Sequence, residues 1–348
     1  MSFLLKAYDH LRPVLFTLQP ETAHGVAFAA GRVLQQCPGG VKVLEAMAGQ
    51  PSPSLARKVG GLSFATPLGL AAGLDKGAEL LPVWKALGFG FVEIGTVTPR
   101  PQPGNPKPRC FRIPSEGLIL NRMGFNSEGA EVVAKRLKRR PKGLVVGGNI
   151  GKNKVTPEET ALEDYRAAYR WIAPEVDYIA LNISSPNTPG LRRLQAPEAL
   201  KPLLEGLLHT RREMALEAQP IFVKLAPDLA FDELDAIVEV IAASGVEGLI
   251  ATNTTLDRGI VSEAQRKQVL AWGDGGLSGV GLKAKAQAVR RRILERISSD
   301  VCFMACGGLS DGLDAREALD DGADLVQIYS ALIFQGPGLV NAINARLV

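Results

Sequence analysis

Short apolar runs alternate with longer amphipathic stretches along most of the chain. The apolar runs end in small or polar residues and cover 67–71, 89–94, 144–149, 178–183, 221–225, 248–252, 301–305 and 325–329. Helical patterns follow them at 77–87, 127–139, 157–173, 197–217, 231–244, 281–298, 312–321 and 337–347. Because parallel strands are joined by right-handed crossovers, this alternation predicts a parallel sheet. Eight such units predict an α/β fold, a closed (β/α)8 TIM barrel. An open doubly wound sheet is the alternative, but no G-x-G-x-x-G turn follows the first run.

Helical patterns also precede the barrel region. Apolar residues recur at helical spacing over 3–18 until Pro20 interrupts them, and two further patterns follow at 22–36 and 41–47. The segment 49–54, rich in Pro and Ser, is typical of a linker. We therefore expect a small helical unit at 1–48 and a barrel at 49–348. Two interpretations of the unit stay open: helices packed on the barrel, or an interfacial membrane anchor that admits a lipid-soluble ligand.

Composition and charge exclude several classes of protein. The 348 residues are 46% hydrophobic and 22% charged, unlike disordered, collagen-like or disulfide-rich chains. No apolar stretch reaches the ~18 residues of a transmembrane helix, and no signal-peptide pattern is present. The net charge is +4 and the basic cluster at 135–140 is interpreted as a solvated helix end, so nucleic-acid binding is not expected. Four cysteines without a CxxC pair indicate reduced thiols in a cytosolic compartment.

Histidines are too few for the commonest metal and acid–base sites. Only His10, His24 and His209 occur, and two of them lie in the first 24 residues. A His-ligated metal or a His general base is therefore hard to build in the barrel, and we expect no metal site.

The ends of the apolar runs are rich in Asn and Thr and carry two lysines, Lys76 and Lys224. Active sites of (β/α)8 barrels lie where the strands end, so these side chains are candidate site residues. Converging asparagines suit a planar ring that bears amide groups, such as a pyrimidine or a flavin, and a lysine beside it can stabilise negative charge. Gly307 and Gly308, with the segment 275–279, fit a backbone phosphate site.

Ser185 has two interpretations. It lies outside any G-x-S-x-G elbow, and no histidine is within sequence reach, so it is not expected to be an acyl-transfer nucleophile. It can abstract a proton if a neighbour such as Thr188 and a water relay that proton. Alternatively, it only supports the Ser-Pro turn. The residues alone leave both interpretations open.

Nine motifs occur in order along nearly the whole chain. They are AAGLDK (71–76), EIGTVTPRPQPGNPKPR (93–109), NRMGFN (121–126), NIGKNK (149–154), LNISSPNTPGLR (181–192), VKLAPD (223–228), ATNTTLDR (251–258), GGLSG (275–279) and LVQIYS (325–330). Together they resemble the class 2 dihydroorotate dehydrogenases, which are quinone-dependent and membrane-associated. The resemblance implies oxidation of (S)-dihydroorotate to orotate through FMN, with a quinone as electron acceptor, in de novo pyrimidine (UMP) biosynthesis.

The resemblance also implies roles for individual residues. FMN is expected to contact Ala72, Gly73, Leu74, Asp75, Lys76, Thr96, Asn149, Asn182, Lys224 and Thr252, with its phosphate on Gly279, Gly308, Tyr329 and Ser330. The pyrimidine is expected to be held by Lys76, Asn121, Arg122, Met123, Gly124, Phe125, Asn182, Asn187, Asn253 and Thr254. Ser185 would be the catalytic base. Lys224 would stabilise the reduced flavin, and Lys76 would pair with the substrate carboxylate.

Two features imply class 2. Class 1 enzymes carry Cys at the position of Ser185, and they lack the N-terminal helical unit. In the family, quinone enters between those helices, and His24, Arg112 and Tyr329 match positions along that route. The resemblance therefore implies a monomer that associates peripherally with the cytoplasmic face of the cell membrane, without a nucleic-acid partner.

Two other functions remain as alternatives. A soluble-type FMN oxidoreductase acting on a pyrimidine with fumarate or NAD would not need residues 1–48. A non-catalytic flavin- or nucleotide-binding membrane protein would not need a base, so Lys76, Ser185 and Lys224 argue against it. One departure from the family is Gly148, where a branched apolar residue is commoner. We expect this glycine to loosen the packing below the flavin.

Overall fold

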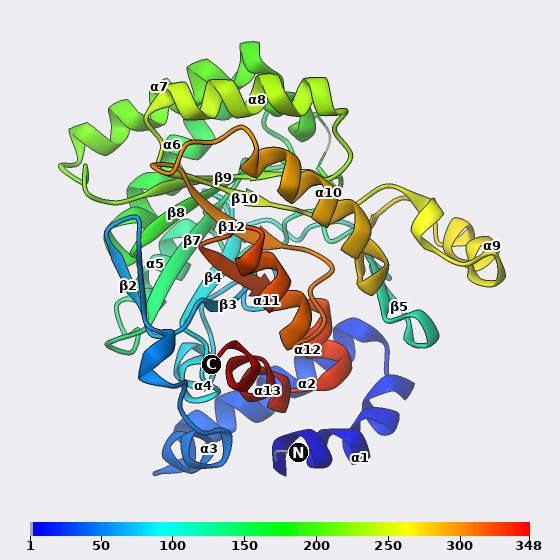
Figure 1. The fold of residues 1–348 in the computed structure, drawn as a ribbon. Helices are drawn as coiled ribbons and strands as arrows, with labels where there is room; N and C mark the ends of the chain where they lie inside the picture. Colours follow the sequence, from blue (N-terminus) through cyan, green and yellow to red (C-terminus); the bar gives the residue numbers. More distant parts are fainter. Residues whose placement is uncertain (1–2, 189) are drawn as a thin grey trace.

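The computed structural model describes residues 3–188 and 190–348. Within them, eight parallel strands form a closed barrel surrounded by helices (Figure 1). The strands are β3 (Leu68–Leu70), β4 (Phe91–Val97), β7 (Val145–Ile150), β8 (Tyr178–Asn182), β9 (Ile221–Leu225), β10 (Gly248–Ala251), β12 (Cys302–Cys306) and β13 (Leu325–Ile328). Each pairs with the next in this order, and β13 closes on β3. The predicted (β/α)8 barrel is confirmed, and the open sheet is wrong.

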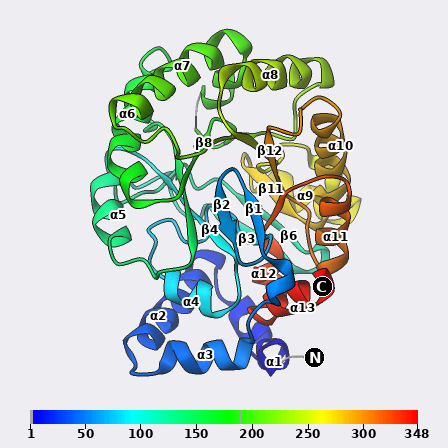
Figure 2. The ribbon, with the colours of Figure 1, turned by 60° about the vertical axis from the view of Figure 1, so that its left-hand side comes forward.

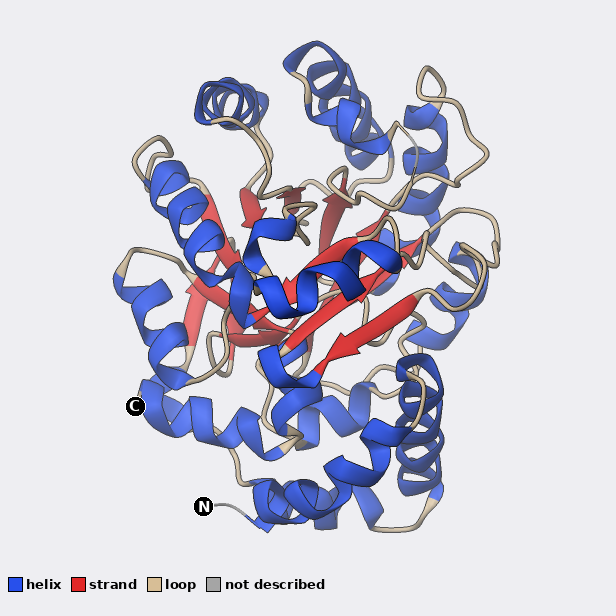
Figure 3. Cartoon of the chain, turned by 90° about the vertical axis from the view of Figure 1, so that its right-hand side faces the viewer, coloured by secondary structure: helices blue, strands red, loops and turns tan. Residues whose placement is uncertain are grey.

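The helices expected around the barrel are present (Figure 3). They are α4 (Leu81–Ala86), α5 (Ala130–Leu137), α6 (Ala161–Ile172), α7 (Pro197–Glu213), α8 (Phe231–Ser244), α10 (Lys283–Leu294), α11 (Gly312–Asp320) and α13 (Gly338–Leu347). The first begins later than the predicted 77–87. The Asp75 carboxylate accepts hydrogen bonds from the backbone N–H groups of Glu79 and Leu80, at 2.7 and 2.8 Å. These bonds hold the segment between Asp75 and Leu80 in a turn, and α4 begins only after it.

Several short elements escaped the sequence patterns. The hairpin of β1 (Arg57–Val59) and β2 (Leu62–Phe64) precedes the barrel, and α9 (Glu263–Ala271) and α12 (Ser330–Gln335) lie in predicted loops. The Pro-rich insertion at 96–126 contains β5 (Cys110–Ile113) and β6 (Leu118–Asn121). These two strands form an antiparallel sheet with β11 (Gly276–Gly279). This sheet brings distant parts of the chain to the mouth of the barrel.

The N-terminal helices α1 (Phe3–Thr17), α2 (Pro20–Gln36) and α3 (Gly40–Ala48) pack against one another and against α4, α12 and α13 (Figure 2). Polar contacts fix α2 to barrel loops, among them Glu21 with Arg109 at 2.7 Å and His24 Nε2 with the Leu74 carbonyl at 2.8 Å. Among the described helices, none is both long enough and apolar enough to cross a membrane.

The packing at Gly148 differs from the expectation. A Cβ atom at this position would lie 2.5 Å from Cγ2 of Ile172, and Ile179 and Val176 also approach it. The residue therefore faces α6 and not the barrel interior, because side chains alternate along a strand and Asn149 is the one that points inward. The prediction of looser packing below the flavin is wrong, since Ile172 fills the space.

Candidate functional site

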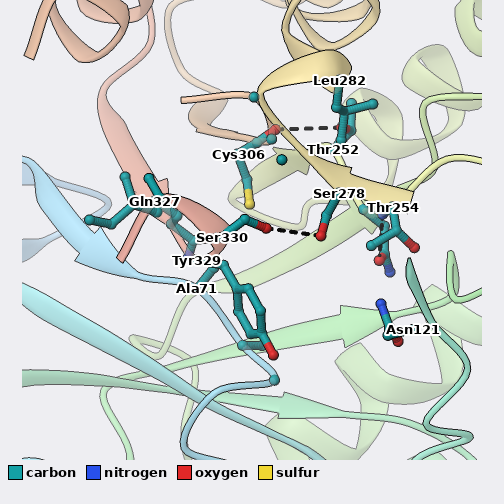
Figure 4. Close-up of a pocket in the computed structure, with 18 of the residues that line it drawn as sticks. Ala71, Asn121, Thr252, Thr254, Ser278, Leu282, Cys306, Gln327, Tyr329 and Ser330 are labelled. Atoms are coloured by element: carbon teal, nitrogen blue, oxygen red, sulfur yellow. Dashed lines mark hydrogen bonds between the residues drawn. The ribbon is translucent and has the colours of Figure 1, made fainter. Parts of the chain in front are cut away.

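A polar cavity lies at the C-terminal ends of the barrel strands. Figure 4 shows Thr252, Ser278, Cys306 and Ser330 around it. Most residues assigned to FMN or substrate from the sequence line this cavity: Ala72, Gly73, Lys76, Thr96, Asn121, Met123, Gly124, Phe125, Asn182, Asn187, Lys224, Thr252, Asn253, Thr254, Gly279, Gly308, Tyr329 and Ser330. Ser185 lines it too. The barrel thus brings the candidate set together, while the ligand that each residue contacts stays a prediction.

Four assigned residues do not line the polar cavity. The Asp75 carboxylate is buried and accepts hydrogen bonds from the start of α4 and from Trp84 Nε1 at 2.8 Å. The Arg122 guanidinium reaches away to the carbonyls of Trp272 and Pro108. The side chains of Asp75 and Arg122 therefore hold loops in place, and any contact of these two residues with a ligand is left to their backbone atoms. Leu74 lines a neighbouring cavity, and Asn149 lies behind the wall.

The asparagine side chains form a connected network. Asn253 Nδ2 donates to Asn182 Oδ1 at 3.3 Å, and Asn182 Nδ2 donates to Thr96 Oγ1 at 2.8 Å. The Thr96 hydroxyl donates to Asn149 Oδ1 at 2.5 Å. Each amide is thereby fixed in orientation by its neighbour. A wall of preorganised amide donors and acceptors can hold a planar ring in one orientation.

Lys76 lies between the polar cavity and a second one, and it lines both. Its ammonium donates to Asn126 Oδ1 at 2.6 Å. Burial and, to a smaller extent, the nearby positive charge of Arg109 lower the pKa of Lys76 to about 8. Lys76 makes no salt bridge with a carboxylate in the described part of the chain, so the ammonium is suited to pair with an anionic ligand.

The Ser185 hydroxyl oxygen accepts the backbone N–H of Asn187 at 3.3 Å and is almost fully buried. This bond supports the turn, as one interpretation expected. Asn187 Nδ2 in turn donates to Asn121 Oδ1 at 3.2 Å, which ties the turn to β6. The Thr188 hydroxyl is buried without a hydrogen-bond partner in the part of the chain that the structure describes. A proton relay requires such an unpartnered hydroxyl, and Thr188 is three residues from Ser185 in the chain, so both interpretations of Ser185 stay open.

Glycines shape the end of the cavity near α12. Gly279 has φ +116°, and a Cβ atom there would lie 2.0 Å from the Gly117 carbonyl oxygen. Gly308 has φ +72°, and its Cβ would lie 2.3 Å from Lys283 Cα. Any side chain at either position would therefore push the chain apart. This end of the cavity is formed by backbone and by the Ser278 and Ser330 hydroxyls, which are hydrogen-bonded to each other at 2.9 Å. Backbone N–H groups and hydroxyls can donate to a phosphate, so this end suits one.

An apolar cavity lies under α1 and α2. It is lined by Tyr8, Phe16, Ala27, Phe28, Trp84, Leu332 and other apolar residues. His24, Arg112 and Tyr329 all line it, and their contact with a quinone stays a prediction. His24 stacks on Phe28 with ring centroids 4.1 Å apart, and burial lowers the pKa of His24. Gly73, Lys76, Asn121, Met123 and Tyr329 line both cavities, so the two share a wall.

Some lining residues were not predicted. Ser278, Cys306 and Gln327 line the polar cavity, and Asn126 contacts Lys76. The Oε1 atom of Gln327 is buried without a partner among the described residues, as expected for a group that awaits a ligand. The alternation of side chains along β13 could have indicated Gln327. Leu325 points into the barrel, so the side chain two residues later points inward as well.

Known proteins resemble this chain along nearly its whole length. The family model described as dihydroorotate dehydrogenase matches residues 54–348. A protein of Halorhodospira halophila named dihydroorotate dehydrogenase (quinone) is 44% identical, over 96% of this chain and 95% of its own. One of Anaeromyxobacter sp. with the same name is 47% identical, over 97% of this chain and 91% of its own. A crystal structure of the Eimeria tenella enzyme in complex with ferulenol superposes with a TM-score of 0.83 at 34% identity, and covers 96% of this chain and 93% of its own. The chain therefore belongs to the dihydroorotate dehydrogenase family.

Proposed function

We propose that this protein oxidises (S)-dihydroorotate to orotate in de novo pyrimidine (UMP) biosynthesis and passes the electrons to a quinone. The observation that carries the proposal is the shared wall between the two cavities at Gly73 and Tyr329. A planar cofactor in the polar cavity is then within reach of an apolar acceptor in the other. An acceptor such as fumarate or NAD, which is polar and charged, has no comparable reason to use the apolar cavity.

FMN is the cofactor we assign to the polar cavity. The glycine end with Ser278 and Ser330 fits its phosphate, and Lys224, Thr96 and the unpartnered Gln327 Oε1 fit the polar edge of a flavin ring. When bound, FMN accepts a hydride from the substrate and gives electrons to the quinone. Lys224 is placed to stabilise negative charge on the ring, because it points into the barrel beneath the cavity.

The remaining polar residues hold the substrate. Lys76 pairs with its carboxylate, and Asn121, Asn182, Asn187 and Asn253 hold the ring at reacting distance. Ser185 takes the proton from C5 while its own hydroxyl proton passes to the Thr188 hydroxyl, which in turn releases its proton to a water.

The test is the visible spectrum of the purified protein, recorded anaerobically before and after dihydroorotate is added. We expect a flavin band that bleaches with substrate and recovers with a short-chain quinone. A band that does not bleach would mean that another molecule is the substrate.

Orotate binding is expected to weaken as pH rises through 8. Lys76 is charged below its pKa of about 8 and neutral above it, so the attraction for the carboxylate is present at low pH and lost at high pH. Orotate affinity should then be constant below pH 8 and fall by up to about tenfold per pH unit above it, measured by flavin spectral perturbation. Lys76→Met should bind orotate weakly at every pH. A wild-type affinity that stays constant to pH 10 would remove Lys76 from this role.

We further propose that α1–α3 attach the protein, as a monomer, to the cytoplasmic face of the cell membrane. Each helix exposes an apolar pair on one face: Leu11 and Val14, Val26 and Val33, Val43 and Met47. Such pairs can enter the headgroup layer while the polar side chains stay in water.

Replacing Leu11, Val14 and Val33 by Gln should lower binding to phospholipid vesicles by at least about tenfold, because each apolar side chain contributes about 1 kcal/mol or more when buried. Vesicle sedimentation measures this. The control replaces Val155, Leu270 and Leu313, which are apolar residues exposed outside the N-terminal helices, by Gln. Equal loss in both variants would contradict the proposed attachment through the helices.

A further inference from the structure

A buried carboxylate lies below the polar cavity. Glu93 on β4 has no exposed surface, and it accepts hydrogen bonds from donors on four other barrel strands. Lys224 Nζ on β9 lies 3.1 Å from Oε1, and Asn149 Nδ2 on β7 lies 2.9 Å from the same atom. Gln327 Nε2 on β13 lies 2.8 Å from Oε2, and the Tyr178 hydroxyl on β8 lies 3.4 Å from it. A group surrounded only by donors is suited to be an ionised carboxylate.

The position of Glu93 follows from the strand pattern. Glu93 follows Phe91 by two residues, and Lys224 follows Phe222 by two, so both pairs point into the barrel. The aromatic residues close the barrel on one side of the ion pair, and the polar cavity lies on the other. Lys224 lines that cavity but Glu93 does not, so Glu93 can act on a ligand only through its neighbours.

The charge of Lys224 depends on this carboxylate. Burial by itself would lower the pKa of Lys224, and this is the largest single effect. The attraction of Glu93 and its hydrogen bond, with a contribution from Cys306, together more than offset burial and raise the pKa. The other titratable groups that face the pair are neutral. Burial raises the pKa values of the Cys306 thiol and the Tyr178 hydroxyl. Glu93 and Lys224 are therefore the charged pair at this level of the barrel in the described residues.

Glu93 also decides which way Asn149 faces. A carboxylate accepts hydrogen bonds but does not donate them, so the amide nitrogen of Asn149 must face Glu93. Its Oδ1 then faces Thr96 and Asn182, which line the cavity. Glu93 thus determines both the charge of Lys224 and the orientation of the Asn149 amide behind the wall of the polar cavity.

We propose that Glu93 is a positioning residue that keeps Lys224 protonated and directed at the ring of the bound cofactor. This inference rests on the proposed binding of FMN. Its consequence is that the negative charge acquired by the ring on reduction is balanced by Lys224 over the whole working pH range. Without Glu93, burial would favour neutral Lys224, and the ring would instead take up a proton at N1.

The test compares wild type with Glu93→Gln after chemical reduction of the bound FMN by dithionite. The protonation of the reduced ring is followed by absorbance from pH 6 to 10. We expect the midpoint in Glu93→Gln to lie at least about one pH unit above that of wild type. An unchanged or lower midpoint would overturn the proposal, because removing a negative charge without discharging Lys224 would favour the anionic ring.

Two further variants separate positioning from general disturbance. In a Lys224→Met background, Glu93→Gln should give no upward shift, because the group through which it acts is gone. Tyr178→Phe removes a hydrogen bond from the same carboxylate without changing charge, so its midpoint should match that of wild type. An upward shift in either case would contradict action through Lys224.

Folding failure of Glu93→Gln would also be informative. A buried lysine without its carboxylate costs stability, because it must either stay charged without a partner or give up the proton that it keeps in the unfolded chain, whereas loss of both partners is often tolerated. The variant with both Glu93→Gln and Lys224→Met should therefore unfold at a higher temperature than Glu93→Gln alone. A double variant that is no more stable would overturn the proposal.

The outcome for this proposal can be told apart from that of the proposed function. If wild type binds no FMN, the proposed function fails, and the unfolding comparison is then the test of the Glu93–Lys224 pair. If FMN binds but dihydroorotate does not reduce it, the dithionite experiment still applies.

Discussion

Replacing Ser185 by Ala is expected to slow reduction of the flavin by dihydroorotate by about 10²–10⁴-fold, the usual contribution of a general base. Ser185 lines the polar cavity, and among residues 3–188 and 190–348 its hydroxyl takes part in one hydrogen bond, which it accepts from the Asn187 N–H at 3.3 Å. Its removal takes no charge from the site, so orotate should still bind. Anaerobic stopped-flow absorbance measures the reduction, and orotate titration of the flavin spectrum measures the binding.

The pH dependence of the same step distinguishes a base from a turn residue. A serine hydroxyl has a pKa far above neutrality, so the wild-type rate should rise with pH. Ser185→Cys should recover part of the rate and level off at lower pH, because a thiol has an ordinary pKa of about 8.5. Near-normal reduction in Ser185→Ala, or a Cys variant with the wild-type pH profile, would show that Ser185 is not the base. Its role would then be to support the turn through its hydrogen bond with Asn187.

The barrel could be predicted because its signal is local. Each strand is a short apolar run that ends in polar residues, and the observed strands differ from the predicted runs by only a few residues, as in 248–252 against Gly248–Ala251. The sheet of β5, β6 and β11 could not be predicted in this way. Leu118–Asn121 pairs with Gly276–Gly279, and a contact over such a sequence distance leaves no periodic pattern in either segment.

The residues of the site could be predicted more completely than the direction in which each side chain points. A family motif implies ligand contacts for every residue of a segment, including Asp75 and Arg122. In the structure the Asp75 side chain accepts hydrogen bonds at the start of α4, and the Arg122 side chain donates to the Trp272 carbonyl. Glu93 lies inside a quoted motif but received no role, because sequence alone does not show that four donors from other strands surround it. These are tertiary facts that only barrel closure creates.

Narrowing the apolar cavity should separate the two half-reactions. Ala27 lines this cavity on the face of α2 that carries His24 and Gly31, and its methyl leaves the space open. Ala27→Trp should lower quinone-dependent turnover by at least about tenfold, since a bulky ring occupies the route and nothing in the polar cavity changes. Reduction of the flavin by dihydroorotate should keep its wild-type rate. Steady-state assays with a short-chain quinone and stopped-flow reduction measure the two steps separately.

Ala29→Trp is the matched control for this prediction. Ala29 is also exposed on α2, but two residues along a helix it points about 200° away from Ala27 and does not line the apolar cavity. It adds the same indole to the same helix, so it should leave both half-reactions unchanged. Equal loss of quinone turnover in the two variants would mean that α2 itself is disturbed. Full turnover in Ala27→Trp would mean that the quinone reaches the flavin by another path, and the apolar cavity would lose its assigned ligand.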